Sequence, residues 1–261
     1  MTDTVTDASA DTPTELVHLD VAGQVATITL DSPHNRNALS RRLVTELFER
    51  LDAAERDDAV KVVVIRSSGR VFCSGADLSE AATVGMEEGS RAMVRMQRQI
   101  VTMGKPVVAE VGGPVRAGGI GIVAASDIAI ASEDATFALT EVKLGLAAAI
   151  ISLTVHHRMN PRAAALTTLG GEVFSGTEAA AYGLVTRAVP VDDLTEEVRR
   201  TCESLTTGAA QGLRESKRIL NHDLVERIDA RGEEMAALSA RLFASDEAKE
   251  AMTAFLTRKS R

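Results

Sequence analysis

The stretch VGGPVRAGGIGIVAASD, residues 111–127, decides how the rest of the sequence is interpreted. It follows an apolar run at residues 107–111 that is typical of a buried strand. Its second half, residues 118–125, has the small side chains of a closely packed helix. Glycine suits a backbone that must approach a ligand closely, and the first turn of a helix offers N–H groups without an intrahelical partner. The stretch therefore predicts either bare N–H donors facing an anionic oxygen or a helix packed tightly on a strand.

Strands and helices alternate on both sides of this stretch as far as about residue 200. Residues 16–19 and 25–30 alternate apolar and polar side chains around Gly23, which predicts a hairpin. Ser40 is a good N-cap for a helix that ends near Arg56. The other expected elements are strands at 61–65, 107–111, 127–131 and 184–189, and helices at 87–103, 150–158, 161–169, 178–183, 192–207, 209–221, 224–244 and 246–257.

This order of elements predicts an α/β fold with a helical C-terminal segment. We expect three parts: a polar, acidic tail at residues 1–14, an α/β core at residues 15–200 and a helical region at residues 201–261. The last part holds more helix than one core needs, so a subunit interface is a reasonable use for it.

The composition of the 261-residue chain argues against several classes of function. Its formal net charge of −8, without a basic run that carries aromatic residues, argues against nucleic-acid binding. No apolar run is long enough to span a bilayer, and the first residues lack the basic and apolar parts of a signal peptide. Two cysteines form no disulfide framework, so we expect a reducing, cytoplasmic setting.

Three stretches carry residues suited to chemistry: FCSGADL at 72–78, the central stretch, and FALTEVKLGL at 137–146. The first two each follow a strand and present glycine-flanked N–H groups, and two such donors that converge would form an oxyanion hole. The third supplies Glu141 in an otherwise apolar segment, where a carboxyl pKa rises into the range useful for proton transfer. Alternatively, Glu141 is an acid near a helix start that pairs with Lys143 or with the helix dipole.

Other polar residues are weaker candidates. Cys73 has no histidine in a motif context nearby, and a small buried cysteine is the usual case. His156 and His157 have no partner at a spacing suited to a metal, so we expect them on a helix surface or in the core. The AGGIG run lacks the G-x-G-x-x-G pattern of dinucleotide sites, and Asp127 is expected to cap a strand end.

These stretches together resemble the enoyl-CoA hydratase/isomerase (crotonase) superfamily over nearly the whole chain after the tail. The motifs that carry the resemblance are, in order, NRNALS at 35–40, FCSGADL, the central glycine stretch, EVKLGL at 141–146 and FASDEAKEAMTAFLTRK at 243–259. The resemblance implies a crotonase-like ββα spiral core with a C-terminal helical trimerisation region, assembled as a homotrimer or a dimer of trimers. It also implies a coenzyme A thioester as substrate, a role in fatty acid metabolism, and neither a further cofactor nor a metal.

By position, the resemblance assigns roles to individual residues. The backbone N–H groups of Ala76 and Gly118 would hold the thioester oxygen, and Glu141 would act as general acid and base. The residues expected to line the CoA side or the substrate are Arg36, Ala38, Ser74, Asp77, Leu78 and Gly121, and those expected to reach a neighbouring subunit's CoA are Phe255 and Arg258 or Lys259.

One departure from the resemblance bears on the reaction. Typical hydratases of this superfamily carry two glutamates twenty residues apart; the second corresponds to Glu141, and the first falls on Gly121. The chain looks closest to bacterial methylglutaconyl-CoA hydratase-like members, which also tend to show glycine there. The first glycine of the family's triplet is Ala117 here. Three functions stay open: a hydratase of short or branched 2-enoyl-CoA, a 3,2-enoyl-CoA isomerase that uses Glu141 alone, and an acyl-CoA-binding protein with little or no turnover.

Overall fold

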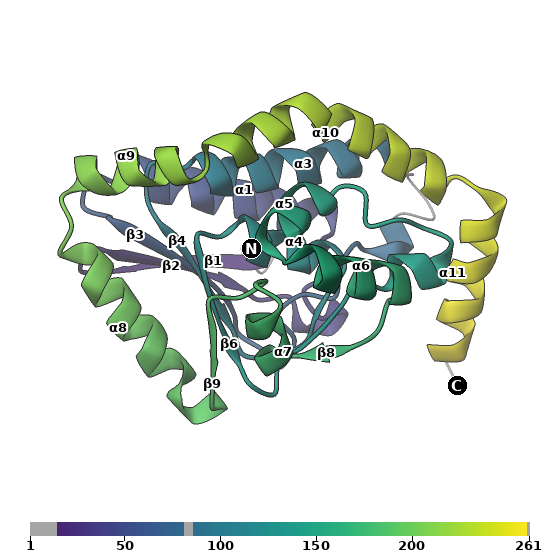
Figure 1. The fold of residues 1–261 in the computed structure, drawn as a ribbon, viewed down its shortest axis with the longest axis horizontal. Coiled ribbons are helices and arrows are strands. Elements are labelled where there is room, and N and C mark those ends of the chain that lie inside the picture. The colour runs from purple at the N-terminus through teal and green to yellow at the C-terminus, as the bar shows by residue number, and fades with distance from the viewer. Residues whose placement is uncertain (1–14, 81–85, 260–261) are drawn as a thin grey trace, which may run out of the picture.

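The computed structural model describes residues 15–80 and 86–259, whose strands form two sheets packed among helices (Figure 1). The strands are β1 (Val17–Ala22), β2 (Val25–Leu30), β3 (Val62–Ser67), β4 (Val107–Val111), β5 (Val115–Arg116), β6 (Ile128–Ser132), β7 (Thr136–Ala138), β8 (Phe174–Ser175) and β9 (Arg187–Val189). The α-helices are α1 (Arg41–Arg56), α3 (Glu87–Thr102), α4 (Gly118–Ala125), α5 (Ser152–Arg158), α6 (Pro161–Gly170), α7 (Gly176–Ala181), α8 (Leu194–Thr206), α9 (Ala210–Leu220), α10 (His222–Phe243) and α11 (Asp246–Lys259). The expected tail at residues 1–14 lies outside the described residues.

The larger sheet has the strand order β1-β2-β3-β4-β6-β9. β1 and β2 pair antiparallel with Ala22 opposite Val25, which confirms the predicted hairpin. The later neighbours in this sheet pair in parallel. Parallel strands are buried on both faces, and β3 and β4 are accordingly rich in valine. The smaller sheet, β5-β7-β8, contains the strand that leads directly into α4.

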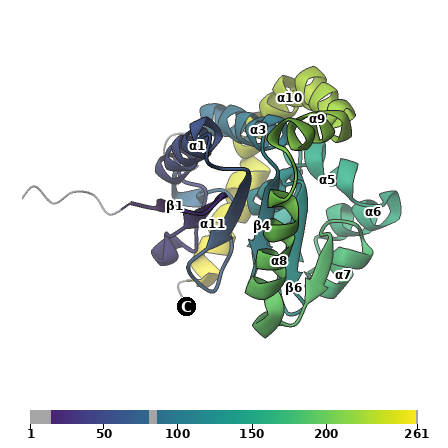
Figure 2. The same cartoon turned by 90° about the vertical axis from the view of Figure 1, so that its left-hand side faces the viewer.

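Helices cover both faces of the larger sheet (Figures 1 and 2). On one face α1 and α3 contribute to the main apolar core, which includes Leu43, Leu47 and Met96. On the other face α8 packs through Leu194 and Val198 against side chains of β3, β4 and β6. The alternation of strands and helices predicted for the first two-thirds of the chain is therefore confirmed.

The last third of the chain is helical, as predicted, and lies across the core (Figure 1). α10 runs along α3, and two ion pairs join these helices: Arg91 to Glu233 at 2.8 Å and Arg98 to Asp229 at 2.6 Å. Among the described helices, none combines the length and the apolar character needed to cross a bilayer.

A buried ion pair anchors the C-terminal helices to the end of the central stretch. The Lys217 side chain reaches from α9 to Asp127 at 2.8 Å and also donates to the carbonyl oxygens of Ile100 and Lys105. Burial lowers the pKa of Lys217, and the negative charge of Asp127 opposes that change. Asp127 also accepts the backbone N–H of Val107 at the start of β4, which confirms its expected place at a strand end.

Several boundaries differ from the predicted ones by two or three residues, and local hydrogen bonds explain the differences at α7 and β9. α7 begins at Gly176 because Ser175 and Glu178 form a capping box two residues earlier than expected. β9 is shorter than expected because the N–H groups of Leu184 and Val185 both donate to the carbonyl of Ala179. Neither difference moves a residue of the candidate site.

Candidate active site

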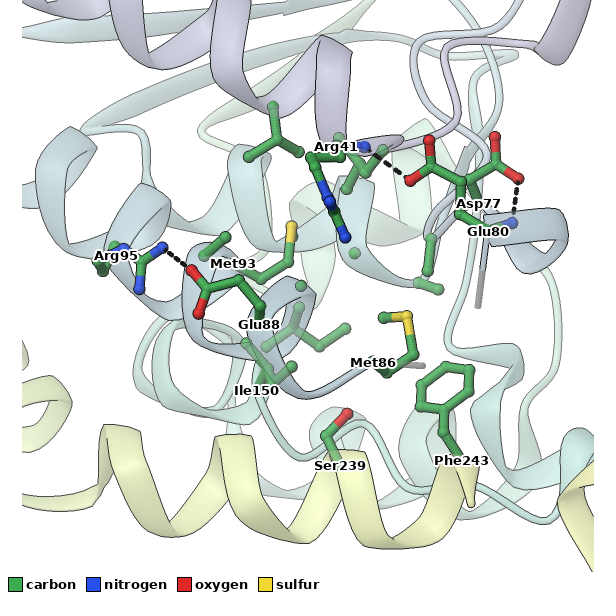
Figure 3. A pocket seen from close by; sticks show the side chains of 18 of the residues that line it. Arg41, Asp77, Glu80, Met86, Glu88, Met93, Arg95, Ile150, Ser239 and Phe243 are labelled. Carbon is green, nitrogen blue, oxygen red and sulfur yellow. Dashed lines mark hydrogen bonds and ion pairs between the residues drawn. The ribbon is translucent and has the colours of Figure 1, made fainter. Parts of the chain in front are cut away.

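A cavity of about 680 Å³ lies between α1, α3, the start of α4 and the 3-10 helix η2 (Thr140–Leu144), as Figure 3 shows from close by. Its lining comes from distant parts of the chain and includes Ala76, Gly118 and Glu141. The three residues expected to carry the chemistry therefore face one space, which is of the size that small-molecule sites have.

The backbone N–H groups of Ala76 and Gly118 belong to segments that lie side by side. Leu39 bridges to Ala76, and the N–H of Leu39 donates to the carbonyl of Gly75 at 2.8 Å. A Cβ atom built on Gly75 would lie 3.6 Å from the nitrogen of Gly118, and one built on Gly118 would lie 4.0 Å from the nitrogen of Ala76. Within the described part of the chain, neither N–H has a hydrogen-bond acceptor. Both donors are thus available to a ligand.

Two kinds of backbone constraint produce this close approach. A Cβ on Gly119 would lie 2.7 Å from the Cβ of Cys73, so this position has no room for a side chain. Gly75 has φ +90°, and a Cβ on it would lie 2.9 Å from the Cβ of Ala117. Ala117 has φ +47°, a left-handed conformation that costs a non-glycine residue about 1–3 kcal/mol. The central stretch therefore serves both purposes considered from the sequence, tight packing inside the fold and open N–H groups at the cavity.

Glu141 is the first acid of η2 and lies on the cavity wall. Its Oε2 atom is buried and has no hydrogen-bond partner among the described residues. Burial raises the pKa of Glu141 from 4.5 to about 7, and a hydrogen bond from its own backbone N–H opposes the rise. Lys143 contributes nothing to this pKa. The expectation of a raised pKa in apolar surroundings is confirmed.

The place of the absent second glutamate is filled by other side chains. Gly121 is buried in α4, and a Cβ on it would lie 2.7 Å from Cγ2 of Ile151 and 3.3 Å from the side-chain amide of Gln97. That amide is fixed, because Thr154 donates to its oxygen at 2.7 Å and its nitrogen donates to the carbonyl of Met93 at 3.3 Å. Ile151 and Met93 line the cavity, whereas Gly121 lies behind them.

Four of the residues expected on the CoA side lie in the loops before α1 and after β3. The N–H of Ser74 donates to the carbonyl of Arg36 at 3.1 Å, and Arg36 is exposed. Ala38 is buried, whereas Asp77 lines the cavity. Although burial acts to raise it, hydrogen bonds from Ser79 and neighbouring groups hold the pKa of Asp77 below its ordinary value. Asp77 is therefore an ionised acceptor near neutral pH.

The remaining CoA-side predictions concern Leu78 and α11. Leu78 is partly buried against Leu146 and Ala248, which connects its loop to η2 and α11. The side chains of Phe255, Arg258 and Lys259 lie outside those that the structure describes. Their contact with the CoA of a neighbouring subunit stays a prediction.

The weaker candidates occupy structural positions. Cys73 is fully buried, and burial raises the pKa of its thiol to about 12, so no thiolate forms there near neutral pH. His156 and His157 are exposed on α5, so of the two expected places, a helix surface and the core, the helix surface is confirmed. Burial and nearby arginine charges lower the pKa of both imidazoles.

The cavity wall that α1 contributes was not expected from the sequence. Arg41, Val44, Phe48 and Asp52 all line the cavity. They follow one another at spacings of three and four residues, which places them on one face of the helix. That spacing was the available signal, but the charged ends of the stripe make it look like an ordinary solvated surface.

Comparisons with known proteins point to one family. The sequence model described as enoyl-CoA hydratase/isomerase matches residues 20–261. A Thermus thermophilus protein described provisionally as an enoyl-CoA hydratase is 35% identical over 204 residues, which span 76% of this chain and 81% of that protein. An (E)-benzylidenesuccinyl-CoA hydratase of Thauera aromatica is 30% identical over 80% of this chain and 84% of its own length. The crystal structure of an enoyl-CoA hydratase from Mycobacterium avium matches with a TM-score of 0.87 at 44% identity, over 93% of this chain and 96% of that one.

Proposed function

Because the chain belongs to the enoyl-CoA hydratase/isomerase family, we propose that it adds water across the 2,3 double bond of an enoyl-CoA. The observation that carries the proposal is that Glu141, with a pKa near neutrality, lines the same cavity as the free N–H groups of Ala76 and Gly118. A carboxyl group with a pKa near the working pH both takes and gives a proton readily. The relatives named as hydratases support hydration as the reaction.

One carboxyl group completes the addition if it acts twice. As a carboxylate, Glu141 takes a proton from water while the water oxygen forms a bond to C3. The electrons of the double bond move toward the thioester oxygen, where the N–H groups of Ala76 and Gly118 stabilise the enolate. Protonated Glu141 then gives its proton to C2, which restores the thioester carbonyl and the carboxylate. Coenzyme A is part of the substrate, and we propose no further cofactor.

The magnitudes explain how one carboxyl group suffices. A single oxyanion-hole donor contributes about 3–4 kcal/mol to the stability of the transition state. A positioned general base contributes about 10²- to 10⁴-fold in rate, which is about 3–5 kcal/mol. The two N–H donors together therefore contribute at least as much as Glu141.

The second candidate is a 3,2-enoyl-CoA isomerase, and the packing around Gly121 favours it. Ile151 and Gln97 leave no room for a second acid there. Moving a double bond needs only one base, which takes a proton from C2 and returns it at C4 through a dienolate whose oxygen the same two N–H groups stabilise. Isomerisation therefore needs no catalytic acid or base besides Glu141.

The experiment compares the purified wild-type chain with Glu141→Gln on 2-enoyl-CoA and 3-enoyl-CoA substrates. Hydration predicts turnover of the 2-enoyl substrate, with kcat/KM rising as pH increases through about 7 because the carboxylate is the active form. Glu141→Gln should lower kcat/KM about 10²- to 10⁴-fold and leave binding of a saturated acyl-CoA unchanged. Glu172→Gln, the same substitution at an exposed position that does not line the cavity, is the matched control.

Each outcome of this experiment separates the candidates. Turnover of only the 3-enoyl substrate would replace hydration by isomerisation. Binding of acyl-CoA without turnover of either substrate would identify an acyl-CoA-binding protein. Equal losses in Glu141→Gln and Glu172→Gln would show that Glu141 is not the general acid and base.

We also propose the assembly that the family resemblance implies, a homotrimer or a dimer of trimers. Exposed apolar side chains on and beside α6, Leu166, Leu169 and Val173, support a surface that is covered in an assembly. Light scattering of the purified protein tests this, and a monomer at micromolar concentration would refute it.

A further inference from the structure

Part of the cavity is lined by α1 on one side and by α3 on the other, and we call this part the groove. On the α1 side its lining residues are Arg41, Val44, Thr45, Phe48, Glu49 and Asp52. The two helices run side by side in the same direction. Gln99 donates to Asp52 at 2.6 Å near their C-terminal ends, and the charge of Arg41 acts on Glu88 near their N-terminal ends.

The middle of this groove is apolar and begins at the oxyanion donor. Val44 and Phe48 of α1 and Ala92 and Met93 of α3 all line it. The terminal methyl of Met93 would lie 3.2 Å from a Cβ built on Gly118. The groove is therefore continuous with the place where the thioester oxygen would bind. Figure 3 shows Met93 inside the cavity, with the Arg95–Glu88 pair on one side and Asp77 on the other.

The far end of the groove is polar and closed by side-chain contacts. Asp52 and Arg95 line it, and the Gln99–Asp52 hydrogen bond joins the two helices there. Between Val44 and Asp52 the helix rises over eight residues, which is about 12 Å. An extended chain covers about 1.2 Å for each bond, so the apolar part accommodates roughly ten bonds.

We propose that this groove binds an unbranched acyl chain of about ten carbons, whose thioester lies at Ala76 and Gly118. This inference rests on the proposed function, because it takes the ligand to be an enoyl-CoA thioester. A four-carbon acyl chain would fill only the part of the groove nearest Gly118 and would leave Phe48 and Ala92 in contact with water. The groove thus suits a longer, straighter chain than the short or branched one expected from the resemblance.

The first test measures kcat/KM of the purified protein for crotonyl-CoA, 2-octenoyl-CoA, 2-decenoyl-CoA and 2-hexadecenoyl-CoA. Burial of the added methylene groups should raise kcat/KM at least about tenfold from crotonyl-CoA to 2-decenoyl-CoA. Little further gain is expected for 2-hexadecenoyl-CoA, because its end would pass the polar side chains into water. A highest value for crotonyl-CoA would overturn the proposal.

The second test blocks the groove. Ala92→Phe should lower the ratio of kcat/KM for 2-decenoyl-CoA to that for crotonyl-CoA at least about tenfold, because the ring occupies the volume of several methylene groups. Ala53→Phe places the same ring on the exposed side of α1 and should keep the wild-type ratio. An unchanged ratio in a folded Ala92→Phe variant would overturn the proposal.

A binding measurement separates this proposal from the proposed reaction. Calorimetry on the wild-type chain should give a dissociation constant at least about tenfold lower for decanoyl-CoA than for butanoyl-CoA. Equal constants would refute the groove even if hydration occurs. Tighter binding of decanoyl-CoA without turnover of any enoyl-CoA would support the groove and refute the hydratase.

Discussion

Replacing Glu141 by glutamine should make the protein more stable at alkaline pH, because the buried carboxyl group has to ionise there. The ordinary pKa of a glutamate side chain is 4.5, whereas burial raises the pKa of Glu141 to about 7 in the folded chain. The folded state therefore binds more protons than the unfolded state between these two values, and stability falls as pH rises through this window. Each pH unit corresponds to about 1.4 kcal/mol, so the full window costs the wild-type chain about 3 kcal/mol.

The assay is urea unfolding of the wild-type and Glu141→Gln chains at pH 5 and pH 8.5, at one fixed protein concentration. At pH 5 both side chains are mostly neutral, and we expect free energies of unfolding within about 1 kcal/mol. At pH 8.5 the variant should be more stable by about 3 kcal/mol. The exposed control Glu172→Gln should differ from the wild type by less than about 0.5 kcal/mol at both values. A Glu141→Gln difference that does not change between the two pH values would refute the reasoning.

Three further substitutions test the packing around the site. Ala117→Gly should raise the free energy of unfolding by about 1 kcal/mol, because glycine adopts φ +47° without strain. Gly121→Glu should lower it by at least about 2 kcal/mol and give no gain in hydration, because its Cβ would meet Ile151 at 2.7 Å. Lys217→Met should lower it by about 3 kcal/mol, because the partly buried Asp127 carboxylate then loses its cation.

Each of these substitutions has a control elsewhere in the chain. Gly212→Glu makes the same change where a Cβ meets nothing within 4 Å, so it should cost far less than Gly121→Glu. Arg218→Met alters an exposed neighbour of Lys217 and should change stability by less than about 0.5 kcal/mol. Ala210→Gly, at the start of α9, should destabilise rather than stabilise. Equal effects in a variant and its control would contradict the structural reason given for that variant.

The parts of the fold that local sequence determines were predictable. The hairpin around Gly23 and the helix capped by Ser40 follow from turn and cap residues that act within a few positions. The helix at residues 118–125 was expected with the bounds that α4 has. The raised pKa of Glu141 followed from its apolar neighbours along the chain.

The parts that depend on distant contacts were not predictable. Lys217 and Asp127 lie far apart in the sequence, and nothing near either residue indicates the buried pair. The groove between α1 and α3 depends on how two helices align, which neither helix encodes alone. In the central stretch positive φ falls on Ala117, and nothing in the sequence around a non-glycine residue indicates it. The division near residue 200, the trimer and the CoA contacts stay predictions.

The side chains packed against Gly121 have a consequence for the history of the sequence. An acid at position 121 clashes until Ile151 or Gln97 becomes smaller. Shrinking Ile151 first opens a void, and shrinking Gln97 first also removes its hydrogen bond with Thr154; neither change adds a catalytic group. Each single substitution toward a second acid at position 121 therefore lowers stability before it can add a catalytic group. The packing around Gly121 thus favours keeping a single carboxyl group in sequences with this interior.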